Sequence, residues 1–177
     1  IRDQETARVA VQAALTGHLV LATLHTNDAP SATARLSDMG IEPYLLAAAM
    51  NGVVAQRLAR TNCPHCETKY YPDDHVLKDA GIPDKVGTVF RKGVGCSRCH
   101  NSGFLGRLGV YEVMEVTSTL RRMIHKARPV HELREVIAKD GGLSLRQEGV
   151  ILALAGRTSL EEIIRVTQDD GEDEPAV

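Results

Sequence analysis

The chain has 177 residues, of which 43% are hydrophobic and 25% are charged, with four Tyr, two Phe and no Trp. This length allows one or two domains with a real hydrophobic core, and the composition excludes a disordered, collagen-like or low-complexity chain. The formal net charge is −2, but residues 169–174 hold five of the 23 acids, which leaves 21 bases against 18 acids elsewhere. So small a surplus gives no electrostatic case for a nucleic-acid partner.

The first elements follow an α/β pattern. Residues 4–15 are expected to form a helix, because Asp3 suits its N-cap and Gly17 its end. Residues 19–24, with the sequence Leu-Val-Leu-Ala-Thr-Leu, are too few for a helix and predict a strand that is buried on both faces.

Apolar periodicity, caps and breakers predict further helices. They are one that starts at Asn27 or Asp28 and ends before Gly40, and those at residues 43–50, 118–127, 130–139 and 144–155. A last helix starts at Ser159, where Ser159 and Glu162 form a capping box. Residues 107–116 alternate like a strand, whereas residues 53–58 fit either a strand or a continued helix.

No segment is expected to span a membrane. The longest apolar run, residues 45–54, is broken by Asn51 and Gly52 and falls far short of the ~20 residues needed. The first residues also lack the basic and then apolar pattern of a signal peptide.

The strongest local signal is a pair of C-x2-C motifs separated by 29 residues. They contain every cysteine of the chain: Cys63, Cys66, Cys96 and Cys99. Two residues between paired cysteines let a turn direct both thiolates at one ion, and two such turns complete a tetrahedral Zn2+ shell. Because four sulfur ligands leave no open position, the motifs predict a structural zinc ribbon, provided that the long intervening segment folds as a subdomain.

Two other interpretations of the cysteines remain open. Two disulfides would require an oxidising compartment, for which nothing in the sequence argues, and a redox C-x-x-C pair would not need its duplicate. His65 and His100 lie beside the motifs and could replace a ligand, although a role as non-ligand neighbours is favoured.

His18 and His25 bracket the predicted strand at residues 19–24. Ligands gather at the carboxyl ends of strands in an open parallel sheet, and His25 would lie at that end. The ordinary alternative is a histidine that is hydrogen-bonded within a loop or core. The 15 glycines form no G-x-x-x-x-G-K-[ST] phosphate loop, so the chain by itself lacks the parts of a complete enzyme.

Taken together, these segments occur in an order that resembles the C-terminal half of the ATPases for type II secretion and type IV pilus assembly. They are Ile-Arg-Asp-Gln-Glu-Thr-Ala at residues 1–7, the stretch from Thr-Gly-His to His-Thr-Asn-Asp-Ala at 16–29, Ala-Gln-Arg-Leu at 55–58 and the cysteine motifs. The resemblance extends to about Thr167.

The resemblance implies a RecA-like P-loop NTPase core in a homo-hexamer that hydrolyses ATP with Mg2+. Arg2 and Asp3 would end the Walker B motif at the nucleotide, and the glutamate that activates water would lie just before Ile1. His25 would reach toward the terminal phosphate as a catalytic residue, with His18 a weaker candidate, since phosphoryl transfer depends on positioning and charge stabilisation.

The implied organisation is a C-terminal part of the ATPase core (1–62), a zinc subdomain (63–104), a strand and helical domain (105–168) and a disordered acidic tail (169–177). The implied partners are inner-membrane platform proteins, contacted from the cytoplasmic side. Retraction motors generally lack the four cysteines, which favours an assembly or secretion motor. The competing hypothesis is a free-standing zinc-ribbon module that binds nucleic acid or protein; the mild charge and few aromatic residues weaken it.

Overall fold

The computed structural model describes residues 1–168, so the predicted acidic tail at 169–177 lies outside the described residues. The chain divides into two compact units. The first unit comprises residues 1–55 and 112–143, and the second comprises residues 56–111 and the described residues from 144 onward. The domain limits expected after residues 62, 104 and 168 remain a prediction. They divide the chain into contiguous segments, whereas each unit combines two separate segments.

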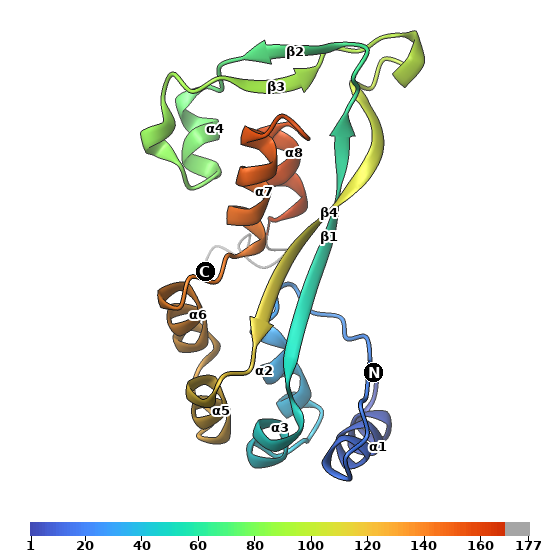
Figure 1. The fold of residues 1–177 in the computed structure, drawn as a ribbon, viewed down its shortest axis with the longest axis vertical. Helices are drawn as coiled ribbons and strands as arrows, with labels where there is room; N and C mark the ends of the chain where they lie inside the picture. Colours follow the sequence, from blue (N-terminus) through green and yellow to red (C-terminus); the bar gives the residue numbers. More distant parts are fainter. Residues whose placement is uncertain (169–177) are drawn as a thin grey trace, which may run out of the picture. The chain divides into compact units, whose positions relative to one another are not determined.

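The first unit is mainly helical (Figure 1). Its helices are α1 (Gln4–Leu15), α2 (Ser31–Asp38), α3 (Pro43–Ala49), α5 (Ser118–His125) and α6 (Val130–Lys139). The predicted helices are confirmed, and Asp3 caps α1 as expected, because its Oδ1 accepts from the Thr6 N–H at 2.8 Å. Helix α5 packs on α3, where the Arg121 guanidinium donates to the Ala47 and Met50 carbonyls at the end of α3.

The strand predicted at residues 19–24 does not form in the described structure, which assigns this segment no strand and no helix. Leu19 and Leu21 are 83% and 88% exposed, so the segment is not buried on both faces either. The physical reason is pairing: a strand of this kind is stabilised by neighbours on both edges, and no other described segment pairs with it. The expectation of a buried strand was therefore wrong for this chain as it stands.

The ambiguous residues 53–58 belong to a strand. Strand β1 (Gly52–Asn62) pairs with β4 (Phe104–Glu115), which confirms the strand predicted at residues 107–116 (Figure 1). Along β1 exposed and less exposed residues alternate, with Ala55 and Ala59 buried. That alternation places one face against the protein and the other in solvent, which a helix could not do over the same residues.

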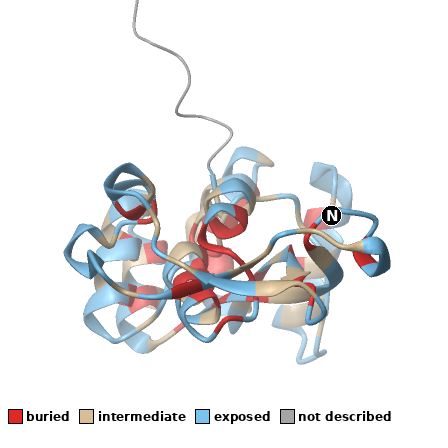
Figure 2. Ribbon diagram, turned by 90° about the horizontal axis from the view of Figure 1, so that it is seen from above, coloured by how far each residue is buried: buried red, intermediate tan, exposed pale blue. Residues whose placement is uncertain are grey.

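The second unit contains the last two helices and also the segment that lies between the two cysteine motifs. Its elements are β2 (Glu67–Tyr70), α4 (Asp74–Asp79), β3 (Phe90–Gly93), α7 (Leu145–Leu154), α8 (Leu160–Val166) and two single-turn 3-10 helices, Pro83–Lys85 and Ser97–Cys99. Strands β2 and β3 form a two-stranded antiparallel sheet with Tyr70 opposite Phe90. Phe90, Leu77, Leu160 and Ile163 are at most 1% exposed. Figure 2 shows buried residues as short red stretches among exposed and intermediate ones.

A buried carboxylate fixes the start of α8. Ser159 caps the helix as predicted, because its Oγ accepts from the Glu162 N–H at 3.2 Å. The other half of the predicted capping box is wrong, since the Glu162 carboxylate turns to two arginines. It accepts from the Arg60 backbone N–H at 2.9 Å, from the Arg60 guanidinium at 2.7 Å, and from Nε and Nη2 of Arg165 at 2.9 and 2.7 Å. Hydrogen bonds from charged guanidinium groups are stronger than one from the neutral backbone N–H of Ser159, the N-cap residue, which a capping box would use.

The substitution Glu162→Gln is expected to lower the free energy of unfolding by about 2 kcal/mol, because it removes the charge from a fully buried side chain between two cations. Burial raises the pKa of Glu162, but hydrogen bonds from Arg165 and Arg60 outweigh burial and lower it from 4.5 to about 2. A depressed pKa stabilises the fold above the unfolded value and loses that contribution as pH falls from about 4.5 toward 2.

Urea unfolding of both proteins at pH 7 and across that acid range measures the difference. The difference should shrink below pH 4.5, and a difference that stays constant with pH would contradict the charge as its source.

Candidate functional site

Each cysteine pair lies in a tight turn of the second unit. The first pair follows β1 directly, and the Cys66 N–H donates to the Cys63 carbonyl at 3.2 Å. The second pair spans the 3-10 turn Ser97–Cys99, in which the Cys99 N–H donates to the Cys96 carbonyl at 3.2 Å. Because a two-residue gap closes each turn, both side chains of a pair leave the backbone on the same side.

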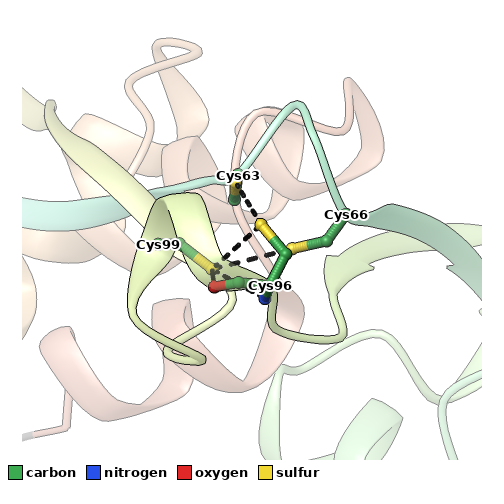
Figure 3. Close-up of side chains that lie close together, drawn as sticks. All are labelled: Cys63, Cys66, Cys96 and Cys99. Carbon is green, nitrogen blue, oxygen red and sulfur yellow. Dashed lines mark hydrogen bonds between the residues drawn. The ribbon is translucent and has the colours of Figure 1, made fainter.

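The four sulfur atoms have the spacing of a tetrahedral metal shell (Figure 3). They all lie within 4.8 Å of one another, with Sγ–Sγ distances of 3.9 Å for Cys63 and Cys96, 3.8 Å for Cys66 and Cys99, and 3.7 Å for Cys96 and Cys99. Four sulfurs at about 2.3 Å from one zinc ion would be about 3.8 Å apart. The residues present therefore fit Zn2+ bound by four thiolates.

The sulfur spacing favours a metal over the disulfide alternative, because Sγ–Sγ distances of 3.7–3.9 Å suit ligands of one ion and far exceed the roughly 2.05 Å of a disulfide bond. Cys63 and Cys99 are buried, whereas Cys66 and Cys96 are partly exposed, so the centre lies at the surface of the second unit. Four protein ligands would complete the coordination, and such an ion would stabilise the fold and catalyse nothing.

Cys66 has one backbone donor, from Gly95, and Cys99 has two. The Cys96 N–H and the Gly103 N–H both point at its sulfur, at 3.2 and 3.3 Å. Burial raises the pKa of the Cys99 thiol, but these two donors outweigh burial and lower it to about 6. Burial raises the pKa of the Cys66 thiol to about 12. The two backbone donors therefore favour the thiolate form of Cys99, which is the form that binds a metal.

The neighbouring histidines stand outside the sulfur cluster. His65 contacts Arg98, with 3.3 Å between Nε2 and Nη1, and His100 has left-handed backbone geometry, with φ of 51°. Among the described residues, the group able to hold a metal consists of the four cysteines alone. The interpretation of His65 and His100 as non-ligand neighbours is favoured by this placement.

Sequence reasoning missed Gly93 and Gly103, whose backbones cross beside the cysteines. A Cβ on Gly103 would lie 2.4 Å from the Gly93 oxygen, and one on Gly93 would lie 1.9 Å from the Gly103 oxygen. The Gly103 carbonyl accepts from the Cys63 N–H at 2.9 Å while its N–H faces Cys99. Gly103 therefore links the two cysteine turns, and the spacing of Gly103 four residues after Cys99 was the signal that could have identified it.

The residues predicted for nucleotide chemistry lie at the start of the first unit. The Ile1 nitrogen donates to the Thr23 carbonyl at 2.6 Å, which brings Arg2 and Asp3 beside the end of residues 19–24. Thr6 donors lower the pKa of Asp3. His18 Nδ1 lies 3.1 Å from Thr16 Oγ1, and His25 is exposed. The structure thus places Arg2 and Asp3 close in space to the segment that carries His25, while His18 lies at its opposite end.

The loop after His25 is tied to helix α6. Asp28 accepts from the Ser31 N–H at 2.9 Å and from Arg134 of α6, with 2.8 Å to Nε and 2.6 Å to Nη2. Burial raises the pKa of Asp28, but the hydrogen bonds from Ser31 and Arg134 outweigh it, so the pKa is lowered. Two donors of Arg134 on one Asp28 oxygen, with the Ser31 N–H on the other, restrain the loop three residues beyond His25.

Comparison with known proteins places this chain in a family. Residues 1–165 match the family described as Type II/IV secretion system protein. The chain is 48% identical over 169 residues to the Type II secretion system protein HxcR of Pseudomonas aeruginosa, covering 96% of this chain and 32% of that protein. It is 43% identical over 169 residues to the Type IV pilus assembly ATPase PilB of Thermus thermophilus, covering 94% and 19%. The chain belongs to the type II/IV secretion system protein family.

A solved structure of the pilus retraction motor PilT with bound ADP has a similar fold, with a TM-score of 0.63 over 96% of this chain and 38% of that one. At 21% identity this likeness concerns the fold alone. The chain spans about a third or less of the length of the relatives named above. Within the described residues, no helix is both long and apolar enough to cross a membrane.

Elemental analysis of the purified chain should find about one zinc ion per chain, since the four sulfurs complete one tetrahedral shell. Cys96→Ser should lose the metal and lower the melting temperature, because binding to a site that is absent in the unfolded state contributes to folding. His65→Ser is the matched control and should keep both. Two disulfides without zinc in the unaltered chain would contradict the metal centre.

Gly103→Ala should weaken zinc binding at least about tenfold, because a Cβ there displaces the N–H that faces Cys99. Gly106→Ala is the matched control: Gly106 also has a positive φ, of 83°, but a Cβ there meets nothing within 4 Å. Competition with a chromophoric chelator gives both dissociation constants. Equal losses in the two variants would assign the effect to backbone strain and not to the crossing of Gly93 and Gly103.

Proposed function

We propose that this chain is part of a motor ATPase that couples ATP hydrolysis to type II protein secretion or type IV pilus assembly. The observation that carries the proposal is the family match over residues 1–165, which takes in the cysteine centre and also the segments at residues 1–7 and 16–29. A free-standing zinc-ribbon module would need only the residues around the cysteines. The extent of the match therefore favours the motor.

The proposed division of labour uses the first unit for the nucleotide. Arg2 and Asp3 lie beside Thr23, so one edge of the unit would face Mg2+ and ATP. His25 would reach the terminal phosphate from an exposed position, on a loop that Asp28 and Arg134 restrain. Phosphoryl transfer needs donors held in place more than it needs covalent chemistry, and a restrained loop suits that need. His18, at the other end of the segment, would have at most a supporting role.

Residues 19–24 would complete their strand in the whole protein. Leu19 and Leu21 are exposed, and the segment pairs with no described strand. We infer that the rest of a RecA-like core supplies the neighbouring strands and covers these side chains. That pairing would place His25 at the carboxyl end of a sheet strand, where ligands bind in open α/β sheets.

The second unit would serve assembly. Zn2+ bound by Cys63, Cys66, Cys96 and Cys99 would be structural, and its presence favours an assembly or secretion motor over a retraction motor. The proposed partners are five further copies in a homo-hexamer and inner-membrane platform proteins on the cytoplasmic side. The chain is similar to a relative from each branch, over 96% of its length for the secretion protein and 94% for the pilus assembly ATPase.

The isolated chain is expected to hydrolyse ATP at background rate, because it contains no phosphate loop. In a full-length protein that carries this chain, His25→Ala should lower kcat about 100-fold through loss of a donor to the transferring phosphate. His75→Ala, in α4 of the second unit, is the matched control and should leave kcat unchanged. Steady-state hydrolysis measures both; rapid turnover by the isolated chain, or equal rates for the two variants, would overturn the assignment.

A further inference from the structure

The last two helices rest on elements that lie between the two cysteine pairs in the sequence. Helix α7 packs against β3, and α8 packs against α4, while both β3 and α4 fall within residues 67–95. At the end of α4, the Arg146 guanidinium of α7 donates to the Asp79 carbonyl. The ion that joins Cys63 and Cys66 to Cys96 and Cys99 therefore closes the loop that carries this support.

Asn62, immediately before Cys63, connects this loop to the turn between α7 and α8. Its side-chain Nδ2 donates to the Arg91 carbonyl of β3 at 3.0 Å and to the Gly156 carbonyl at 3.1 Å. Its backbone N–H donates to the Arg157 carbonyl at 3.0 Å. Asn62 is 4% exposed, and its Oδ1 is buried without a partner among the described residues. Such a group is tolerable only where all its neighbours are held in place.

Three further hydrogen bonds join the cysteine-bounded segment and β1 to the start of α8. Tyr70 of β2 donates to the Glu161 carboxylate at 2.7 Å and accepts from the Leu160 N–H at 3.4 Å. Thr158 donates to the Arg60 carbonyl at 2.7 Å, beside the contact between Arg60 and the buried Glu162. The start of α8 is thus held by strands that lead into, or lie between, the cysteine turns.

None of these parts is stable alone. The β2–β3 sheet has four residues in each strand, and an isolated pair of strands is at best marginally stable in water. Helix α8 has seven residues, well below the ~12 that an isolated helix needs. The β2–β3 sheet and α8 therefore depend on each other, and the sheet also depends on the joining of the two cysteine turns at its ends.

We propose that the zinc centre is a conformational lock: the bound ion holds β2, α4 and β3 in the arrangement on which α7 and α8 dock, and its loss releases these helices selectively. The lock concerns residues 145–166 and leaves the first unit folded. Coupling of this kind is reciprocal, so docking of the helices also strengthens zinc binding. The inference depends on the metal centre and not on ATP hydrolysis.

Hydrogen exchange tests the release. Zinc is removed with a chelator, its release is followed by absorbance, and exchange is compared at residues 145–166 and, as an internal control, at residues 118–139 of the first unit. Exchange at 145–166 should accelerate at least about tenfold while 118–139 changes little, because local opening exposes only the released segment. Unchanged exchange at 145–166, or equal acceleration in both regions, would overturn the lock.

Zinc affinity tests the reverse direction. Glu162→Gln changes no metal ligand, yet it should raise the zinc dissociation constant about fivefold or more by loosening α8. Glu132→Gln is the matched control, because it makes the same chemical change in an ion pair with Arg128 of the first unit. The control should stay within about twofold of the unaltered chain. Equal zinc affinity for Glu162→Gln and the unaltered chain would show that the helices and the ion are independent.

Discussion

Four sulfur atoms from two turns, 3.7–3.9 Å apart where neighbours are paired, impose the central constraint on the second unit. The turns are far apart in sequence, and the segment between them contains the two short strands β2 and β3, the short helix α4 and a single 3-10 turn. A metal shell would replace the extended core that so few residues cannot build. The position of β3, and with it the support for the last two helices, follows from that closure.

Small residues and buried polar groups convert the constraint into a defined structure. Gly93 and Gly103 let two backbones approach more closely than any side chain would allow, which brings an N–H to the Cys99 sulfur. Asn62 and Glu162 then connect the cysteine-bounded segment and β1 to α7 and α8 through directed hydrogen bonds. Such groups are costly to bury, and here the Glu162 carboxylate and the Asn62 Nδ2 find partners in other segments of the chain.

The first unit has a different character. Its helices close around a small apolar core that includes Ala7, Leu46 and Leu133, and they hold the segment at residues 19–24 with its leucines exposed. Of the polar residues expected to handle a nucleotide, Arg2, Asp3 and His25 lie at one end of that segment and His18 lies at the other. In the proposed motor, this unit contributes part of a nucleotide site and the second unit contributes a rigid attachment. The family assignment fits both roles without requiring that either unit act alone.

Local signals in the sequence identified most elements correctly, because caps, breakers and cysteine spacing act over a few residues. Asp3 as the N-cap of α1, Pro129 before α6 and the paired cysteines are of this kind. Residues 53–58 stayed ambiguous, since a short apolar run suits a helix or a strand until a partner strand is known. The buried strand at residues 19–24 failed for the same reason: strand formation depends on neighbours that the local sequence does not name.

The sequence by itself determined the helices, the ligand types and the family resemblance. Only the tertiary structure decided that the Glu162 carboxylate bonds arginines in place of its own helix end, that Gly103 faces Cys99, and that α7 and α8 rest on the segment between the cysteines. The contact of Glu162 with Arg60 and the support of α7 and α8 join distant parts of the chain, and Gly103 is placed by the crossing of its backbone with that of Gly93. Periodicity and capping carry no information about such contacts, because the energy that fixes them exists only when the units have folded.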